Sequence, residues 1–289
     1  MTAILRNNQI NPRRLCALLA LCVLVVGFSS MVPAQSFNEP TMNNPRNPLL
    51  EISSSLGDIQ LELFPDAAPL NVERVRQLAA AERAYYDNLT FHRSVNDTLI
   101  QLGAPERAGR ERPATTVRDE INARGLGLEQ QQVLDPGGRP HAWLNIRDQM
   151  DFQSKLLMPL YRRLNISNES QLVQRQDEVL GQLRNMNLLQ AYEQMGYRYD
   201  GTLASRRPLA GSVVMANYGP NTNDGELVIL LRDAPWLTGT HTVVGRVASG
   251  MDVVEQIGRY PNASVRVYQV RPVSVTPAED TINNGQSTP

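Results

Sequence analysis

Arg93 carries a side chain that can hold a polar ligand group, because a guanidinium is permanently charged and presents five N–H donors in a rigid fork. It follows Phe91 and His92 at the end of a predicted short β-strand. Successive side chains of a strand point to opposite faces, so one of His92 and Arg93 must face a core or a cleft. By itself the triplet more often marks an ordinary surface arginine, and a second segment is needed to give Arg93 a role.

The composition is that of an ordinary globular protein of one or two domains, with 289 residues, 42% of them apolar and 20% charged. The net charge of -1 and the lack of a basic stripe argue against nucleic acid as a partner. Both cysteines, Cys16 and Cys22, precede the globular part of the sequence. That part therefore has no disulfide or thiol chemistry.

The first 34 residues have the layout of a secretory signal peptide. Arg6, Arg13 and Arg14 precede an apolar run over residues 15–28, and small residues follow up to Ala34. We therefore expect cleavage after Ala34 and export to the periplasm of a bacterium, with no membrane segment in the mature chain. A retained N-terminal anchor is the alternative, although the apolar run is short for a membrane span.

Hydrophobic patterns divide the rest of the chain into β-rich and helical parts. Residues 35–47 are polar and rich in Pro and Asn, which predicts a disordered lead-in, and residues 277–289 form a polar tail. Two β-rich parts, residues 48–103 and 208–276, contain short alternating runs bounded by turn residues. The predicted strands cover residues 49–53, 59–64, 89–94, 98–103, 212–216, 227–231, 242–247 and 264–275.

Two predicted helices accompany these strands. One starts at Pro69, with Glu73 in its first turn, where the helix dipole favours an acid. The other covers residues 251–258. Short strands with two helices, and no repeated strand–helix–strand unit, predict a closed antiparallel barrel rather than a parallel sheet.

Residues 104–207 interrupt the β-rich pattern, and we expect them to form a helical subdomain inserted into the β-rich domain. The stretch 104–113 is rich in Arg, Glu, Gly and Pro and is interpreted as a loop. From about residue 151 apolar residues recur at helical spacing, and Asn168 is placed to cap a second helix that ends near residue 184. A third, shorter helix ends at Gly196.

A group of motifs on both sides of this interruption gives Arg93 a context. Residues 215–223 read MANYGPNTN and residues 236–247 read WLTGTHTVVGRV. With five shorter motifs, they make the chain resemble the cyclophilin-type peptidyl-prolyl cis-trans isomerases. The shorter motifs are LGDI at 56–59, FPDAAP at 64–69, FHR at 91–93, QLG at 101–103 and GMDVV at 250–254. Several motifs in the family's order make the resemblance specific, although it covers less than half of the chain.

The resemblance implies an eight-stranded antiparallel barrel with two flanking helices, and an activity that rotates the peptide bonds preceding proline. Arg93 would be the catalytic donor to the prolyl nitrogen, and the substrates would be unfolded or extended polypeptides that contain proline. No metal or cofactor is implied. The residues implied to bind the substrate are Leu99, Gln101, Ala216, Asn217, Glu226, Val228, Trp236, Leu237 and His241.

Some of these positions have a purely structural alternative. For Trp236 the alternative is an ordinary core residue. For His241 it is a histidine at the edge of a strand that forms a hydrogen bond with the backbone. His92 is interpreted as structural, because it shares a strand with Arg93 but points to the other face.

Three positions depart from the family's pattern. Thr98 and Val228 stand where the family usually has phenylalanine rings of the proline pocket, and Glu226 replaces a glutamine. Because each aromatic ring can bury about 150–250 Å², we expect proline to bind more weakly by a few kcal/mol. A carboxylate at Glu226 could also pair with Arg93 and divert its donors.

Three functional hypotheses follow. The first is an exported prolyl isomerase that helps envelope proteins to fold. The second is a cyclophilin fold with little isomerase activity, which works as a binding or chaperone-like module through an apolar groove in the helical insert, unless the insert's leucines simply pack on one another. The third is an unrelated secreted β protein. The leucines in question are Leu156, Leu157, Leu160, Leu183 and Leu189.

Overall fold

The computed structural model describes residues 42–80, 82 and 84–273 of the chain. All of these residues belong to one compact unit. The predicted signal peptide, most of the predicted lead-in and the predicted tail lie outside the described residues. Within the described part, no helix is both long and apolar enough to cross a membrane.

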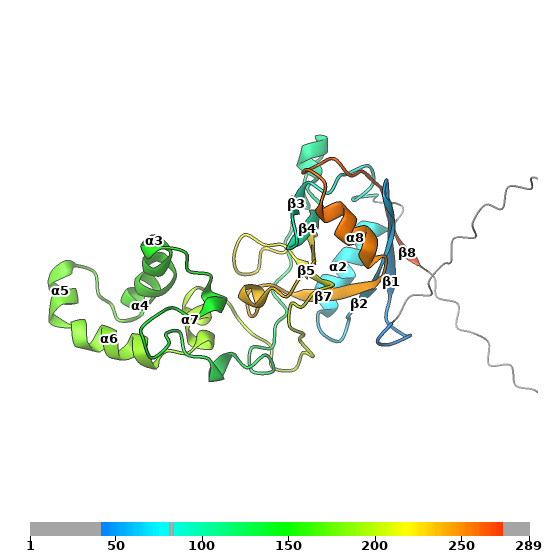
Figure 1. Ribbon diagram of the computed structural model, residues 1–289. Coiled ribbons are helices and arrows are strands. Elements are labelled where there is room, and N and C mark those ends of the chain that lie inside the picture. Colours follow the sequence, from blue (N-terminus) through cyan, green and yellow to red (C-terminus); the bar gives the residue numbers. More distant parts are fainter. Residues whose placement is uncertain (1–41, 81, 83, 274–289) are drawn as a thin grey trace, which may run out of the picture. The chain divides into compact units, whose positions relative to one another are not determined.

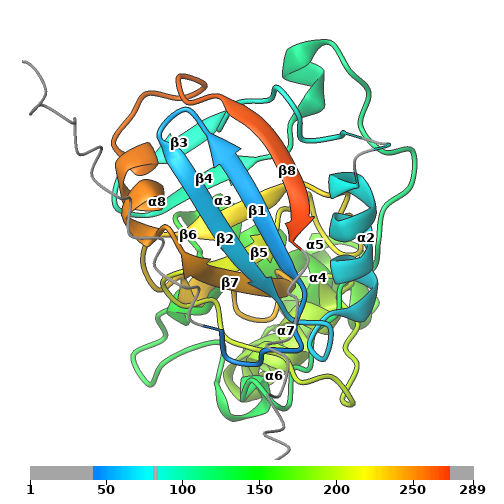
Figure 2. The same ribbon diagram turned by 90° about the vertical axis from the view of Figure 1, so that its right-hand side faces the viewer.

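Eight antiparallel strands form a single sheet (Figures 1 and 2). Hydrogen bonding joins them in the order β3-β4-β6-β5-β7-β2-β1-β8. The prediction of an antiparallel, mainly β structure is confirmed, and strands lie near the predicted places. The strand predicted over residues 89–94 is an exception, because β3 begins only at Arg93 and His92 therefore precedes it. The strands are β1 (Leu49–Ser54), β2 (Gly57–Leu63), β3 (Arg93–Val95), β4 (Leu99–Leu102), β5 (Ser212–Met215), β6 (Leu227–Leu230), β7 (Val243–Ser249) and β8 (Val267–Val273).

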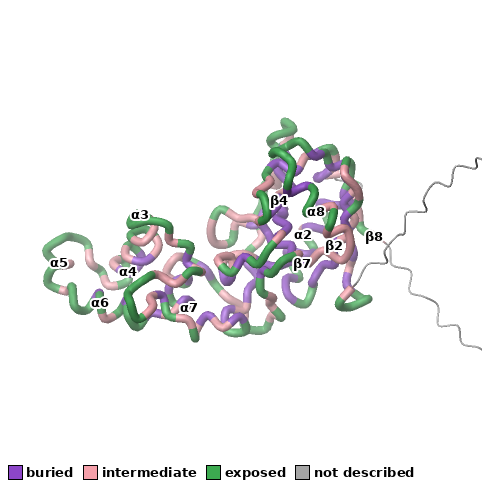
Figure 3. Tube along the Cα trace, in the orientation of Figure 1, coloured by how far each residue is buried: buried purple, intermediate pink, exposed green. Residues whose placement is uncertain are grey.

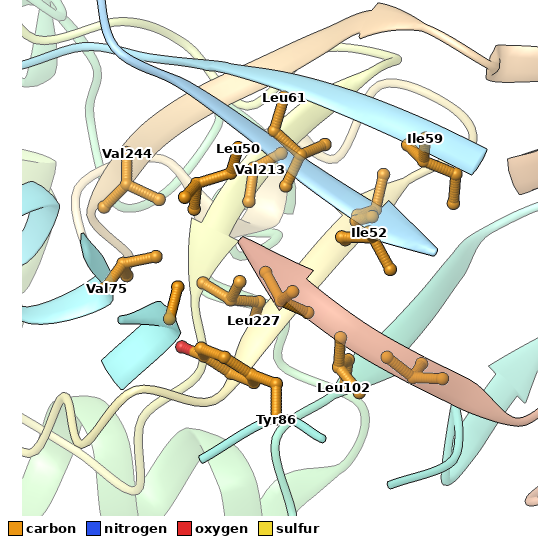
Figure 4. Close-up of a cluster of buried hydrophobic side chains, with 14 of the residues drawn as sticks. Leu50, Ile52, Ile59, Leu61, Val75, Tyr86, Leu102, Val213, Leu227 and Val244 are labelled. Carbon is orange, nitrogen blue, oxygen red and sulfur yellow. The ribbon is translucent and has the colours of Figure 1, made fainter. Parts of the chain in front are cut away.

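The main core lies on one face of this sheet. In the hairpin of β1 and β2, Leu50 pairs with Leu61 and Ile52 pairs with Ile59, so all four side chains point to the same face. None of the four is accessible to solvent. Figure 4 shows them meeting side chains from β4, β5, β6 and β7 and from the segments near α2. Full burial of such a side chain contributes roughly 1.5–3 kcal/mol, which makes this face the main source of stability.

The edge strands of the sheet are β3 and β8, and the chain next to each of them meets the other. Thr90 and Arg266 form an isolated antiparallel bridge. Around it, the Phe91 amide donates to the Val265 carbonyl at 3.0 Å, and the Val267 amide donates to the Leu89 carbonyl at 2.8 Å. These bonds hold the segment that leads into Arg93 against the start of β8.

Helices α2 (Pro69–Ala79) and α8 (Met251–Gly258) lie on opposite sides of the strands in Figure 2. The predicted apolar stripe of α2 is confirmed, because its members are buried. The placement of Glu73 in the first turn is wrong, since no acid lies there. Instead, the Glu120 carboxylate accepts hydrogen bonds from the Leu70 amide at 3.0 Å and the Asn71 amide at 2.8 Å. A distant acid thus satisfies the free N–H groups and the dipole of this helix.

Five further helices occupy residues 149–194, close to where helical periodicity predicted them. The helix predicted over residues 168–184 is broken at Arg175, whereas Asn168 caps it as expected, accepting from the Gln171 amide at 2.9 Å. A π-helical turn, η4 (Gln153–Leu157), joins the first two helices. The five are α3 (Gln149–Phe152), α4 (Met158–Arg163), α5 (Glu169–Gln174), α6 (Gln176–Asn185) and α7 (Leu188–Gln194).

These helices have a hydrophobic core of their own. Leu156, Leu160 and Leu188 are fully buried in it, together with Leu128 from an earlier turn. In Figure 3 the positions along α3 and α5 are exposed or partly buried, whereas α4, α6 and α7 also contain buried residues. The remaining short helical turns are η1 (Pro105–Ala108), η2 (Leu128–Gln130), η3 (Ala142–Leu144) and η5 (Pro235–Leu237).

Candidate functional site

Strand pairing places the predicted site residues of β3, β4 and β6 side by side. Arg93 pairs directly with Gln101, and Gln101 pairs directly with Val228. Residues that pair across a sheet share a face, so the three side chains form one row. The neighbouring residues Ile100 and Ile229 point the other way, into the main core. The row therefore lies on the face of the sheet opposite to that core.

A smaller apolar cluster covers part of this second face. It contains Leu99 and Val228, which are 9% and 6% exposed, together with partly buried Ala216, Trp236 and Leu237. Five residues that were all predicted to contact a substrate thus pack together, although more than a hundred positions separate the first of them from the others. The cluster is completed by Phe64, Ala67, Val95, Val214, Leu230, Ala234 and Val243.

Arg93 is exposed at the end of the row. Its Nη1 donates to Gln101 Oε1 at 3.3 Å. Within the part of the chain that the structure describes, the Arg93 guanidinium forms no ion pair. Most of its five N–H donors are therefore free to bind a ligand.

The side-chain amide of Gln101 connects Arg93 to a buried acid. Its oxygen accepts from Arg93, and its nitrogen donates to Glu226 Oε1. Because a carboxylate only accepts hydrogen bonds, the amide nitrogen must face Glu226 and the amide oxygen must face Arg93. The Gln101 amide is therefore held in one orientation.

Glu226 is 3% exposed and is held by two further donors. His92 Nε2 lies 3.0 Å from Oε1, and Arg112 Nη1 donates to Oε2 at 2.8 Å. Burial would raise the pKa of Glu226, but the hydrogen bonds from His92 and Arg112 outweigh it and hold the pKa below its ordinary value. The expectation that Glu226 pairs with Arg93 is wrong, because His92, Arg112 and Gln101 take up its carboxylate.

A glycine turn next to Glu226 fixes the position of this acid. Gly225 has a φ of +127°, and a Cβ built there would lie 2.2 Å from Leu78 Cδ1 in α2. The Tyr86 hydroxyl donates to the Gly225 carbonyl at 2.7 Å. Glycine is required here because any larger residue would be strained and would collide with α2. The segment Asp224-Gly225-Glu226 can therefore pack directly against helix α2.

Arg112 is a site residue that sequence reasoning missed. Besides Glu226, it donates to Asp224 Oδ2 at 2.7 Å and to Glu106 Oε1 at 2.6 Å. Its guanidinium also lies 5.6 Å from the centre of the Tyr218 ring. Residues 104–113 were interpreted as a loop because their composition is polar. The sequence did contain one indication of Arg112, namely the acid Glu226. A buried carboxylate requires a cationic partner, so an arginine elsewhere in the chain had to be sought for it.

Asn217 and His241 both interact with Thr240. Asn217 Nδ2 donates to the Thr240 carbonyl at 2.9 Å, and His241 Nδ1 lies 3.0 Å from the Thr240 hydroxyl. Burial lowers the pKa of His241 to about 4, so its ring is neutral near pH 7. The Ala216 amide donates to the Glu226 carbonyl at 2.8 Å and is not available to a peptide. This part of the predicted site is therefore tied together largely by its own hydrogen bonds.

Trp236 is held from both sides. Its ring packs with the apolar cluster, and the Arg232 guanidinium lies 5.7 Å from the ring centre. A cation over an indole ring stabilises it by about 0.5–1 kcal/mol at an exposed site. Trp236 thus keeps a fixed position at the border of the cluster while part of its surface stays accessible.

Comparison with known proteins identifies the family. The family model described as cyclophilin type peptidyl-prolyl cis-trans isomerase/CLD matches residues 49–279, which is most of the chain. The chain belongs to this family. The match includes the whole of the row formed by Arg93, Gln101 and Val228.

Individual relatives are similar over most of their length. Peptidyl-prolyl cis-trans isomerase-like 1 of Rhizopus delemar is 28% identical over 207 residues, which cover 72% of this chain and 78% of the relative. Peptidyl-prolyl cis-trans isomerase ppi1 of Schizosaccharomyces pombe is 26% identical over 209 residues, covering 72% and 84%. A crystal structure of a Cryptosporidium parvum cyclophilin type isomerase, in the presence of the dipeptide Ala-Pro, covers 78% of this chain and 99% of that chain, with 17% identity and a TM-score of 0.45.

The predicted site of this cyclophilin thus consists of two halves. A polar half, in which hydrogen bonds link Arg93, Gln101 and Glu226, lies beside an apolar half that contains Leu99 and Val228. The two halves meet at β4 and β6, where Gln101 pairs with Val228. The arrangement can offer donors and an apolar surface to the same ligand.

Proposed function

We propose that this cyclophilin catalyses the cis-trans isomerisation of peptide bonds before proline in extended polypeptides, with Arg93 donating to the prolyl nitrogen. The observation that carries the proposal is the row of Arg93, Gln101 and Val228, in which free guanidinium donors lie beside the apolar cluster. A proline ring is apolar, and the nitrogen at its edge is the atom that a donor must reach.

The chemistry requires a donor rather than a nucleophile. The peptide C–N bond resists rotation by about 18–20 kcal/mol, because the nitrogen lone pair is shared with the carbonyl. A turnover of ~10²–10³ s⁻¹ requires the removal of roughly 6–7 kcal/mol from that barrier. As the bond twists, the lone pair localises on nitrogen, and a donor already aimed at it stabilises the twisted state.

The apolar half supports a weak proline pocket. Leu99 and Val228 are almost completely buried, so Leu237, Trp236 and Ala216 supply most of the apolar surface that a ligand can reach. Thr98 is partly exposed beside Leu99 and has no ring to offer. We therefore expect a high KM together with a substantial kcat.

The test is isomerisation of a short peptide with one X–Pro bond by the full-length protein. We expect kcat/KM to fall about 10²-fold in Arg93→Ala, the cost of losing one preorganised donor. Arg93→Lys keeps the charge but loses the fork, and it should recover only part of the rate. Equal rates for the wild type and Arg93→Ala would contradict the proposal.

A second function, binding of unfolded chains, is favoured by a cavity among the helices. The cavity has a volume of about 610 Å³ and is lined by Leu157, Leu172, Val173 and Leu180, among others. Val173 is 67% exposed and Leu180 is 39% exposed. By contrast, Leu156, Leu160 and Leu183 are buried in the helices' core, as the packing alternative predicted, and Leu189 is packed against that core.

This second function is tested by light scattering of a reduced, aggregating client protein. We expect Val173→Glu to abolish suppression of aggregation, because it places a charge in the cavity wall. The matched control is Gln174→Glu, a charge added at the next, exposed position. If both variants suppress aggregation like the wild type, the cavity does not bind the client.

We also propose that the protein is exported and that its clients are exported polypeptides. The support is the basic–apolar–small layout of residues 1–34. N-terminal sequencing of the protein from a bacterial periplasmic fraction should begin at Gln35. A product that keeps residue 1, or that remains in the membrane fraction, would favour the retained anchor.

Two finer features of the fold belong to the same proposal. We infer that the sheet closes into a barrel through the bonds between residues 89–91 and 265–267, and that the helical residues within 104–207 are an insert in the family's fold. Closure would fix the chain just before Arg93. Slow amide exchange at Phe91 and Val267 would support closure, and rapid exchange at both would contradict it.

A further inference from the structure

Arg112, which lies outside the strands, is connected to the proposed catalytic group through two other side chains. Hydrogen bonds run from Arg112 to Glu226, from Gln101 to Glu226 and from Arg93 to Gln101. Arg93 and Arg112 thus lie at the two ends of one short network, although no contact joins them directly.

We propose that Arg112 is a positioning residue for the isomerase reaction, which acts on Arg93 through Glu226 and Gln101. The inference rests on the proposed function. It assigns a role to residues 105–113, a segment that composition alone marked as a loop. It also accounts for the replacement of the family's usual glutamine by an acid at position 226.

The first step of the argument concerns the orientation of the Gln101 amide. A glutamine at position 226 could either donate to or accept from Gln101, so it would allow both orientations of that amide. An ionised Glu226 can only accept, and therefore allows one orientation. In that orientation the Gln101 oxygen faces Arg93 and holds one of its N–H groups.

The second step concerns the charge on Glu226. A protonated Glu226 could donate its proton to the Gln101 oxygen, and the amide would then turn its nitrogen towards Arg93, where two donors repel. Arg112 prevents this, because its guanidinium binds Glu226 Oε2 at 2.8 Å inside a buried site. The titratable or charged groups around Glu226 are Tyr85, His92, Glu106, Arg112, Tyr218 and Asp224.

The third step concerns Arg112 itself, which has two acidic partners besides Glu226. Glu106 in η1 accepts from Nη2 at 2.6 Å, and Asp224 accepts from Nη1 at 2.7 Å. These bonds fix the guanidinium before any ligand binds. Arg112 is thus rigid enough to position Glu226, which a mobile surface arginine would not be.

His92 also binds Glu226, but it cannot replace Arg112. Its Nε2 lies 3.0 Å from Oε1, whereas its Nδ1 is buried without a partner among the described residues. Arg112 is the permanently charged member of the pair.

The test is the pH profile of kcat and KM for three chains: the wild type, Arg112→Met and Arg112→Met/Glu226→Gln. We expect Arg112→Met to lower kcat about 10-fold at pH 7, with KM changed less than about twofold, because Arg93 is displaced while the apolar half is intact. Its kcat should fall further as the pH is lowered, because Arg112 no longer helps to hold the pKa of Glu226 below its ordinary value. The wild type and the double variant should lack this additional fall.

Controls separate a positioning role from a structural one. Arg107→Met removes an exposed arginine of the same segment and should leave all parameters unchanged. Arg112→Lys should restore the flat pH profile, since it restores the charge. If Arg112→Met keeps the wild-type kcat, or if its acid fall persists in the double variant, the positioning role is overturned.

A second readout keeps this inference apart from the proposed function. The side-chain amide protons of Gln101 can be observed by ¹H–¹⁵N NMR without any substrate. We expect one of them to shift downfield in the wild type, because it binds a carboxylate, and to return towards the free value in Arg112→Met at pH 5.5. An unshifted signal in the wild type would overturn the positioning role, whereas an inactive wild type with the shifted signal would overturn only the proposed function.

Discussion

The polar and apolar halves of the candidate site are built in different ways. In the polar half, each group has a specific partner: Arg93 binds Gln101, and Gln101 binds Glu226, which is held in turn by His92 and Arg112. In the apolar half, position is set by packing, apart from the contact of the Arg232 guanidinium with the Trp236 ring. The polar half is therefore determined by several residues at once, whereas the apolar half depends on the volume of each side chain.

This difference shows where the site has departed from the family's usual pattern. The replacement in the polar half, Glu226, comes with a matching cation in Arg112, so the network is complete. The replacements in the apolar half, Thr98 and Val228, remove two rings, and among the described residues the cluster contains only the rings of Phe64 and Trp236. We infer that orientation of the donor was retained and that tight proline binding was reduced.

The largest expected effect comes from breaking the polar half at its centre. Glu226→Ala should lower the free energy of unfolding by about 3 kcal/mol, because it leaves the buried His92 and the partly buried Arg112 without their shared partner. Urea unfolding measures this change. Glu111→Ala, which removes an exposed acid from the neighbouring segment, is the control and should cost less than about 0.5 kcal/mol. A similar small loss for both variants would mean that the network does not hold the site together.

A smaller effect is expected from rebuilding the apolar half. Thr98→Phe should lower KM about 10-fold without raising kcat, because a ring at this partly exposed position adds apolar surface for proline. Thr98→Val has nearly the same shape as threonine and serves as the control. An unchanged KM in Thr98→Phe would show that the apolar half is already complete or does not bind proline.

The smallest effect concerns the pH dependence of stability through His241. Its pKa is about 4 in the folded protein and about 6.5 when unfolded, so the unfolded state takes up the proton first. Stability should therefore fall as the pH drops below 6.5, by about 1 kcal/mol at pH 6 relative to pH 8. His241→Asn should lose this difference in urea unfolding. If the wild type and the variant respond to pH alike, the ring of His241 is not protected from water.

Much of the fold could be predicted from the sequence, because its strands and helices have regular periodicity. The hairpin of β1 and β2, the apolar stripe of α2 and the cap at Asn168 depend on residues within one segment. The first turn of α2 could not be predicted in the same way. Its acid is Glu120, which is some fifty positions away and becomes a cap only when the chain has folded.

The same distinction applies to the site. The apolar cluster and the row that starts with Arg93 lie on strands, where register determines which side chains meet. Arg112 lies in an irregular segment, where no periodicity indicates direction, and its role follows only from the partners that it meets. The expected pair of Arg93 and Glu226 was wrong for this reason, because no sequence pattern indicates that Arg112 binds Glu226 instead.

The central claim is that Arg93 donates to the nitrogen of the rotating bond. The most direct measurement is the rate of cis-trans exchange of one X–Pro peptide, followed by NMR with equal concentrations of the wild type and of Arg93→Ala. We predict exchange that is about 10²-fold faster with the wild type. Exchange at the same rate with both proteins would contradict the claim.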